Sequence, residues 1–262
     1  MPGERVTVDS IELSQASAVR TAQADELFSF PGRWVGGGSL ILGPILIASG
    51  ALLRSPFHFF APQQLAAYQA HPTLITAAYS LYSIGSVVLC FGIIALANLI
   101  GRWNRVWAAW AGSLAVLGLF NRTFSAGVDH LAFQLVRVQN LNMAVQAVSH
   151  SYRAFHIFRY LNGAIMIGWV LLAIGAYRSG TLGWFRSVAL GLMVMLPIGT
   201  LKGTEIRSLA IVGLCIALIP LGISMLRGGL PLSRRAKLWT IVVIAWSIIH
   251  AILTIRFPVL MN

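Results

Sequence analysis

The segment from Trp107 to His130, WAAWAGSLAVLGLFNRTFSAGVDH, decides the fold because it is an apolar helix of membrane-spanning length. It carries Asn121 and Arg122 deep inside and ends on Asp129 and His130. A charged side chain in hydrocarbon costs roughly 3 kcal/mol by insertion scales, so an arginine at this depth usually faces protein or water and often marks function. The segment therefore predicts a membrane-spanning helix with one polar, inward-facing side.

The composition of the whole chain agrees with a bilayer environment. Of its 262 residues, 57% are hydrophobic and 10% are charged, whereas about a quarter of the residues of a soluble domain are charged. The net charge of +12 comes from basic residues that sit singly or in pairs between apolar runs. This pattern is typical of the positive-inside rule and of contact with anionic headgroups. No basic stripe with interleaved aromatic residues is present outside the apolar runs, which argues against nucleic-acid binding.

Apolar segments recur along the chain at lengths near the ~20 residues that cross a bilayer. They are residues 35–53, 73–100, 107–128, 157–177, 187–201, 208–226 and 238–256. The sequence thus predicts an all-α, polytopic transmembrane bundle of about seven spans, in which the fifth is short and contains Pro197. Residues 1–34 form a polar cytoplasmic tail, and residues 35–262 form one transmembrane domain.

Basic residues in the connections set the orientation. With the N-terminus inside, eleven Lys and Arg residues fall on the cytoplasmic side and seven on the outer side, and this bias favours an inside N-terminus and an outside C-terminus. Tryptophans fall at the cytoplasmic ends of the spans, as an interfacial belt does: Trp34, Trp103, Trp107, Trp184 and Trp239. We therefore expect a multi-pass protein of a bacterial-type cytoplasmic (inner) membrane.

Residues 131–150 follow the third apolar segment and have an amphipathic pattern. Apolar residues recur at steps of three and four, with Asn140 on the opposite side. The pattern predicts an amphipathic helix on the outer surface or an extension of the third span above the membrane.

Polar residues gather toward the predicted outer side. The two acidic residues beyond the N-terminal tail, Asp129 and Glu205, lie there with all six histidines. Arg122 and Asp129 are about two helical turns apart, so they share a face and stand ~10 Å apart along it. His250 lies ~18 Å into the last span. Glu205 belongs to a Gly- and Thr-rich turn, residues 199–207, whose depth requires burial in protein or contact with water. Together these residues predict a polar cavity that opens outward.

One function that fits such a cavity is non-catalytic. The protein would bind an amphiphilic, lipid-like molecule, help to move it, or confer resistance to it. Polar residues would hold the headgroup: Asn121, Arg122, His130, Arg153 and Lys202. The expected partners are then the lipid bilayer and an amphiphilic small molecule, with no cofactor and no metal.

The alternative is a membrane-embedded enzyme, such as an isoprenoid or lipid cyclase or hydrolase. Asp129 or Glu205 would be the general acid, with His250 or His130 as its partner. A purely structural interpretation has Arg122 and Asp129 pair with neighbouring helices and lock the bundle. A transporter is disfavoured because the halves show no clear inverted repeat, and a metal site because the histidine spacing matches no tight motif.

Two stretches carry a family resemblance. Residues 150–191, HSYRAFHIFRYLNGAIMIGWVLLAIGAYRSGTLGWFRSVALG, look like a segment of a bacterial polytopic membrane-protein family known only as a domain of unknown function. Residues 36–53, GGGSLILGPILIASGALL, are similar in style. The resemblance implies a membrane topology, and it implies no activity and no functional residues.

Overall fold

The computed structural model describes residues 30–58, 61–153, 157–196, 205–228 and 242, and these residues form helices and no strand. The helices are α2 (Gly32–Leu53), α3 (Ala61–Ala70), α4 (Pro72–Gly101), α5 (Arg105–Val138), α6 (Leu141–Arg153), α7 (Ile157–Arg178), α8 (Trp184–Gly191), the 3-10 helix η1 (Leu192–Met195) and α9 (Glu205–Arg227). The chain divides into two compact units, residues 1–227 and 228–262, and all of these helices belong to the first. The predicted all-α fold is confirmed.

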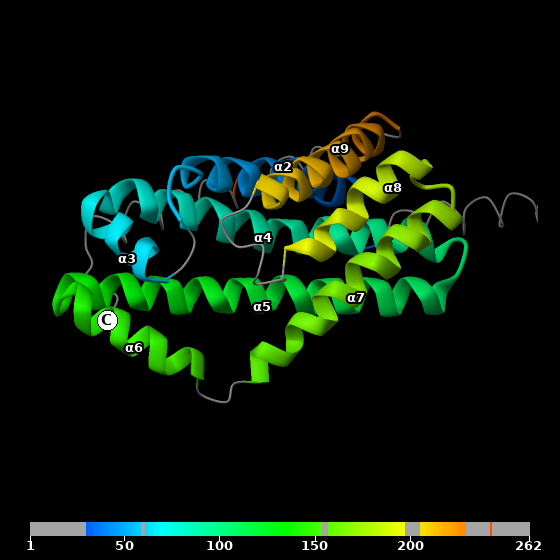
Figure 1. Cartoon of the computed structure of the whole chain (residues 1–262). Coiled ribbons are helices and arrows are strands. Elements are labelled where there is room, and N and C mark those ends of the chain that lie inside the picture. The colour runs from blue at the N-terminus through cyan, green and yellow to red at the C-terminus, as the bar shows by residue number, and fades with distance from the viewer. Residues whose placement is uncertain (1–29, 59–60, 154–156, 197–204, 229–241, 243–262) are drawn as a thin grey trace, which may run out of the picture. The chain divides into compact units, whose positions relative to one another are not determined.

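Helices α2, α4 and α5 form three successive layers with α4 in the middle (Figure 1). The contact between α2 and α4 is the most extensive in the structure. The two helices approach closely at Gly85, where an added Cβ atom would lie only 2.8 Å from the backbone nitrogen of Ile47. In a bilayer, where no hydrophobic force drives helices together, such small residues give the van der Waals contact that holds them.

A short turn reverses the chain between α4 and α5. Asn104 caps α5, and its side-chain oxygen accepts a hydrogen bond from the backbone N–H of Trp107 at 2.9 Å. Asparagine is a preferred N-cap because it satisfies a backbone donor that has no partner within the helix. The turn therefore sets α5 antiparallel to α4.

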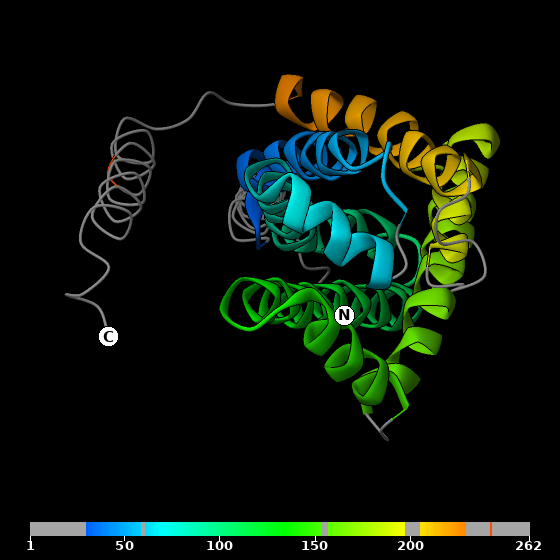
Figure 2. The same ribbon diagram turned by 60° about the vertical axis from the view of Figure 1, so that its left-hand side comes forward.

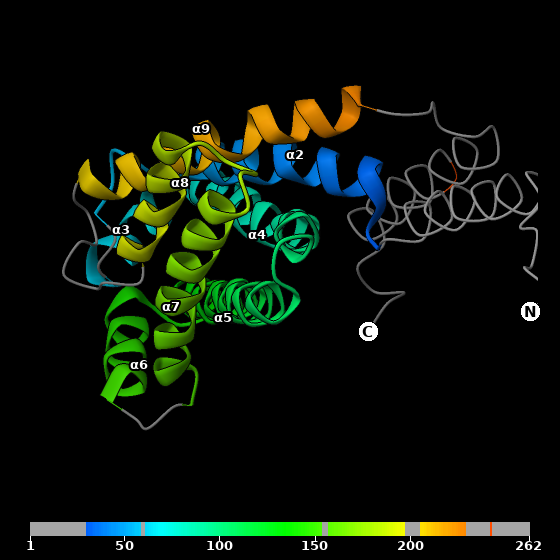
Figure 3. The same cartoon turned by 90° about the vertical axis from the view of Figure 1, so that its right-hand side faces the viewer.

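Helices α7 and α9 cover the two outer layers. α7 packs against α5, α9 packs against α2, and α8 with η1 contacts both α7 and α9 (Figures 1 and 3). Arg186 of α8 donates a hydrogen bond from Nη2 to the carbonyl oxygen of Ala217 at 2.6 Å. This bond joins α8 to α9 close to Pro220, which cannot donate to the backbone ladder of α9.

Most of these helices share one apolar core. Its fully buried side chains come from α2, α4, α5, α7 and α9, and include Leu40, Leu89, Leu96, Trp169 and Leu214. Large apolar side chains are also exposed on several helices, among them Ile84 at 53%, Trp110 at 63% and Phe120 at 58%. Extensive apolar exposure of this kind marks a surface that contacts lipid or another protein.

A second apolar cluster joins α3 and α6 to the start of α4 and the end of α5, and we name these four segments the end cap. Tyr68 of α3 stacks on Phe133 of α5 with ring centroids 4.7 Å apart, and Tyr79 of α4 meets the same ring edge-on at 5.1 Å. Figure 2 brings this end of the structure forward. The end cap is therefore a packed cluster of four helical segments with its own small apolar core.

The amphipathic residues 131–150 are divided between two helices, while their position relative to a membrane stays a prediction. α5 continues to Val138, and α6 follows as a separate helix. Leu141, Ala144, Val145 and Val148 place the apolar side of α6 in the end-cap cluster.

Among the described residues, three helical stretches are long and apolar enough to cross a membrane: Gly32–Leu53, Pro72–Gly101 and Leu209–Arg227. The predicted third span, 107–128 in α5, is not one of the three. Shorter apolar stretches are Gly163–Arg178 and Trp184–Met195. The predicted fifth span, 187–201, begins earlier than expected, at Trp184, and tightens into a 3-10 turn at Leu192. The predicted seventh span, 238–256, lies outside the described residues apart from Val242. The structure is thus compatible with a membrane protein, while the count of seven and the orientation stay predictions.

Candidate functional site

The polar segment of α5, residues Asn121 to Asp129, interrupts the side of the helix that faces the core. Buried residues recur at helical spacing on both sides of it: Ala108, Ala111, Ala115 and Gly118 before, and Ala132, Phe133 and Val136 after. The same spacing carried through the segment reaches Arg122, Ser125 and Asp129. The outward face carries exposed apolar residues instead, at Leu117, Phe120, Val128 and Leu131. The spacing therefore places these polar residues on the side of α5 that faces the core.

Close packing of α7 encloses the start of this segment. A Cβ atom added to Gly168 would lie 2.6 Å from the backbone nitrogen of Ala115, and one added to Gly118 would lie 2.5 Å from Cγ1 of Ile165. One turn further along α5, Asn121 is only 2% exposed. Arg122 and Asp129 are partly exposed, so the segment opens progressively toward the end cap.

Local bonds hold the segment in place. The hydroxyl of Thr123 donates to the carbonyl oxygen of Leu119 at 3.1 Å, and that of Ser125 donates to the carbonyl oxygen of Asn121 at 2.9 Å. In a helix, the hydroxyl of serine or threonine can donate in this way to the backbone carbonyl four residues earlier. Asn121, Arg122 and Asp129 each have an interaction partner as well. The segment is therefore ordered. This order is consistent with a preorganised binding site and with a purely structural role in helix packing.

Arg54 follows the first predicted span, residues 35–53, which predicts a place in the outer loop, but in the structure it is a buried cation. It follows the last residue of α2 and is only 5% exposed. Its guanidinium carbon lies 4.7 Å from the ring centre of Tyr82 and 5.0 Å from that of Tyr79. A desolvated cation–π contact is worth about 2 kcal/mol. The signal in the sequence was the spacing of the two tyrosines, which puts them on one face of α4.

Asp129 lies at the level of Arg54 along the bundle. Tyr79 contacts Phe133 across the antiparallel helices α4 and α5. Tyr82 lies about one turn after Tyr79 on α4, and Asp129 lies about one turn before Phe133 on α5. Because the helices are antiparallel, both steps go in the same direction along the bundle. Tyr82, which Arg54 covers, and Asp129 therefore stand at the same height.

Glu205 begins α9 close to this level. α9 runs antiparallel to α2, with Sγ of Cys215 within 3.6 Å of the carbonyl oxygen of Pro44. Glu205 lies ten residues before Cys215, and Arg54 lies ten residues after Pro44. The register thus brings the backbone of Glu205 toward the end of α2, while its side chain lies outside the described structure.

The other predicted site residues do not all join this region. His130 is exposed on α5, and Arg153 is the last residue of α6, where its side chain lies outside the description. Lys202 and His250 lie outside the described residues. Within the described part of the chain, no three His, Cys, Asp or Glu residues cluster as metal ligands.

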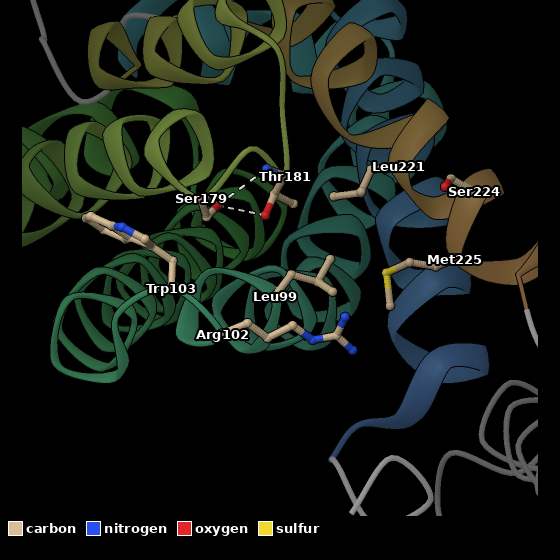
Figure 4. Close-up of a pocket in the computed structure, with 8 residues that line it drawn as sticks. All are labelled: Leu99, Arg102, Trp103, Ser179, Thr181, Leu221, Ser224 and Met225. Atoms are coloured by element: carbon tan, nitrogen blue, oxygen red, sulfur yellow. Dashed lines mark hydrogen bonds between the residues drawn. The ribbon is translucent and has the colours of Figure 1, made fainter. Parts of the chain in front are cut away.

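Two pockets among the described residues lie at the opposite end of α5 from the end cap. The larger, of about 460 Å³, is lined by the turns after α4 and α7 and by α9 (Figure 4). The smaller, of about 300 Å³, lies at Asn104, Val106, Trp107, Trp110 and Leu171. The outward-opening cavity predicted from the sequence is not among them, and it stays a prediction.

Comparison with known proteins gives no assignment. No protein-family model, no curated protein and no solved structure matches the chain. The resemblance of residues 150–191 to a bacterial membrane-protein family therefore stays an expectation, and functional inference depends on the chain's own residues.

Proposed function

We propose that this chain is a multi-pass protein of a bacterial cytoplasmic membrane, with about seven spans and its N-terminus inside, that binds an amphiphilic, lipid-like molecule. The observation that carries the proposal is the inward position of Arg122 and Asp129 on α5, between two apolar clusters. Charged residues are expensive at such a depth, and they usually mark a site where a polar ligand or water is handled.

The length of α5 supports the placement of this site near the outer leaflet. α5 has 34 residues and is therefore about 51 Å long, whereas the hydrocarbon core is about 30 Å thick. With Arg105 at the cytoplasmic surface, Arg122 lies ~25 Å along the helix and Asp129 ~36 Å along it. The end cap would then stand outside the bilayer and cover the polar segment from the outer side.

The chemistry of the segment suits an anionic headgroup. A guanidinium can donate two parallel hydrogen bonds to a phosphate or carboxylate, and the amide of Asn121 can add another. Arg153, Lys202 and His130 supply further donors in this proposal. The apolar tail would lie among the helices or in the adjoining lipid.

Topology is tested by reporters inserted at two exposed positions. An alkaline phosphatase inserted after Gln139, between α5 and α6, is expected to be active because this enzyme folds only outside the cytoplasm. A green fluorescent protein inserted after Gly180, between α7 and α8, is expected to fluoresce because it folds inside. The reverse pair of signals contradicts the proposed orientation, and equal signals at both positions contradict a span between them.

Ligand binding is tested by extraction of the molecules that copurify with the full chain in mild detergent. Arg122→Met removes the inward cation at similar volume, and Arg137→Met removes an exposed arginine from the same helix as the matched control. We expect mass spectrometry to find an anionic amphiphile with wild type and with Arg137→Met, and about tenfold less with Arg122→Met, since a charge-assisted hydrogen bond contributes about 1.5–3 kcal/mol. Equal amounts of the same amphiphile from all three proteins would rule out a binding site at Arg122.

The enzymatic alternative has one observation in its favour, which is the common level of Asp129 and the start of α9 at Glu205. Two acidic residues whose backbone positions lie at one height are an arrangement that acid–base chemistry can use. Asp129→Asn separates the two functions. A binding protein would yield the same bound molecule with this variant, whereas an enzyme would accumulate a different, unreacted one.

A further inference from the structure

The larger pocket lies where three distant segments meet. Leu99, Arg102 and Trp103 come from the end of α4 and the following turn, Ser179 and Thr181 from the turn after α7, and Leu221, Ser224 and Met225 from the last part of α9. Figure 4 shows the long side chain of Arg102 extended along one side, with the paired hydroxyls of Ser179 and Thr181 on another. This pocket is at the end of the bundle opposite to the polar segment of α5, so it constitutes a separate site.

The hydroxyl groups of the pocket can donate to an anion. Oγ of Ser179 and Oγ1 of Thr181 lie 2.7 Å apart, and either can be the donor. The single hydroxyl hydrogen of Ser179 has two possible acceptors, Oγ1 of Thr181 at 2.7 Å and the carbonyl oxygen of Ala176 at 3.2 Å. When Ser179 donates to Thr181, the closer of the two, the hydrogen of Thr181 is directed to a third group. Ser224 is exposed on α9, which leaves its hydroxyl accessible from the same space. The guanidinium of Arg102 adds a permanent positive charge.

Among the described residues, the surroundings of the pocket are cationic. Arg33, Arg105, Arg178, Arg186 and Arg227 lie at the helix ends on this side. The acidic residues of the described helices, Asp129 and Glu205, belong to the other end. Arg178 is stacked over the ring of Trp103, with 5.4 Å between its guanidinium carbon and the ring centre. A surface of this sign attracts anionic lipid headgroups by about 1 kcal/mol for each basic residue.

The remaining lining is apolar and includes a partly exposed tryptophan. Leu99, Leu221 and Met225 form the apolar part of the pocket. Trp103 is 41% exposed beside it, and tryptophan favours the level of the headgroups. A ligand here would have its polar group among arginine and hydroxyl donors and its carbon chain against leucine and methionine.

We propose that this pocket binds the phosphodiester headgroup of an anionic phospholipid of the cytoplasmic leaflet. Arg102 contacts the phosphate, Thr181 and Ser224 donate hydroxyl hydrogen bonds, and one acyl chain lies along Leu99 and Met225 between α4 and α9. This site is distinct from the amphiphile site proposed on α5, and its assignment to the cytoplasmic leaflet rests on the orientation proposed above.

Native mass spectrometry of the purified full chain tests the proposal, with dioleoyl phosphatidylglycerol as the probe. Arg102→Gln removes the cation, and Thr181→Val removes only a hydroxyl at nearly the same volume. Arg105→Gln is the control, because Arg105 is exposed at the same end and does not line the pocket. We expect the apparent Kd for the first bound lipid to rise about tenfold with Arg102→Gln, about threefold to fivefold with Thr181→Val, and less than twofold with Arg105→Gln.

Two further ligands separate the possible sources of the phosphate. Dioleoyl phosphatidylcholine has the same chains and phosphate but no net charge, and we expect it to bind at least fivefold more weakly. Soluble glycerophosphate at millimolar concentration is expected to leave the bound lipid in place. Equal effects of Arg102→Gln and Arg105→Gln would overturn the site, as would unchanged affinity in Thr181→Val. Displacement of the lipid by glycerophosphate would overturn the assignment to a lipid and indicate a soluble phosphate ester instead.

Discussion

Substitution of Gly168 by alanine tests how closely α5 and α7 must approach to enclose the polar segment. The added Cβ would lie 2.6 Å from the backbone nitrogen of Ala115 and 2.9 Å from its Cα. Ordinary van der Waals contact begins near 3.4 Å, so the helices must separate by about 0.8 Å, the difference of 3.4 and 2.6. A gap of that size forfeits a quarter to a half of the dispersion energy across a contact. We therefore expect a destabilisation of about 1–3 kcal/mol, as in other overpacked interiors.

The matched control is Gly163→Ala on the same helix, where the added Cβ meets no atom within 4 Å. It should be neutral or stabilise the protein by up to about 1 kcal/mol, because alanine is the better helix former. Thermal unfolding in nanodiscs, followed by the fraction that stays monodisperse on size exclusion, compares the two variants. Equal midpoints for Gly168→Ala and Gly163→Ala would refute the inferred close packing of α7 on α5.

Two other contacts give simpler predictions in the same assay. Trp107→Phe removes the hydrogen bond from Nε1 to the carbonyl oxygen of Leu171, 2.8 Å long, and should lower stability by about 1 kcal/mol; an unchanged midpoint would show that this bond contributes nothing. Arg186→Met removes the donor to the Ala217 carbonyl and should cost about 1–3 kcal/mol, with increased protease cleavage in the turn before α8 as the second readout. A more stable Arg186→Met protein would contradict the role of this bond in joining α8 to α9.

The apolar runs of the sequence were sufficient to locate α2, α4, α5, α7 and α9, because each of these helices carries one long apolar stretch. They were less successful at the predicted fifth span. Pro197 has no N–H to donate to the carbonyl of Met193, and that carbonyl accepts instead from Leu196 in a 3-10 bond of 3.2 Å. A proline thus changes the backbone hydrogen bonding of the residues that precede it. Mean hydropathy contains no information about this effect.

The inward position of Arg122 and Asp129 also followed from sequence, since helical spacing alone puts them on one face. Two features did not follow. Arg54 was assigned to a loop, because its burial depends on how the end of α2 meets Tyr79 and Tyr82 of α4. The pocket beside Arg102 is assembled from three separate segments between Leu99 and Met225, and local sequence patterns do not show that such segments meet.

The most direct test of the central claim is the environment of α5 in a bilayer. Nitroxide labels are attached to Leu117→Cys, Phe120→Cys and Ser125→Cys in a background where Cys90 and Cys215, both free, are replaced by alanine. Power-saturation EPR in nanodiscs then compares collision with oxygen, which concentrates in lipid, and with a water-soluble nickel chelate. We predict high oxygen and low nickel accessibility at positions 117 and 120, and low oxygen accessibility at position 125. High oxygen accessibility at position 125, or high nickel accessibility at positions 117 and 120, would contradict a membrane-spanning α5 whose polar segment faces the protein interior.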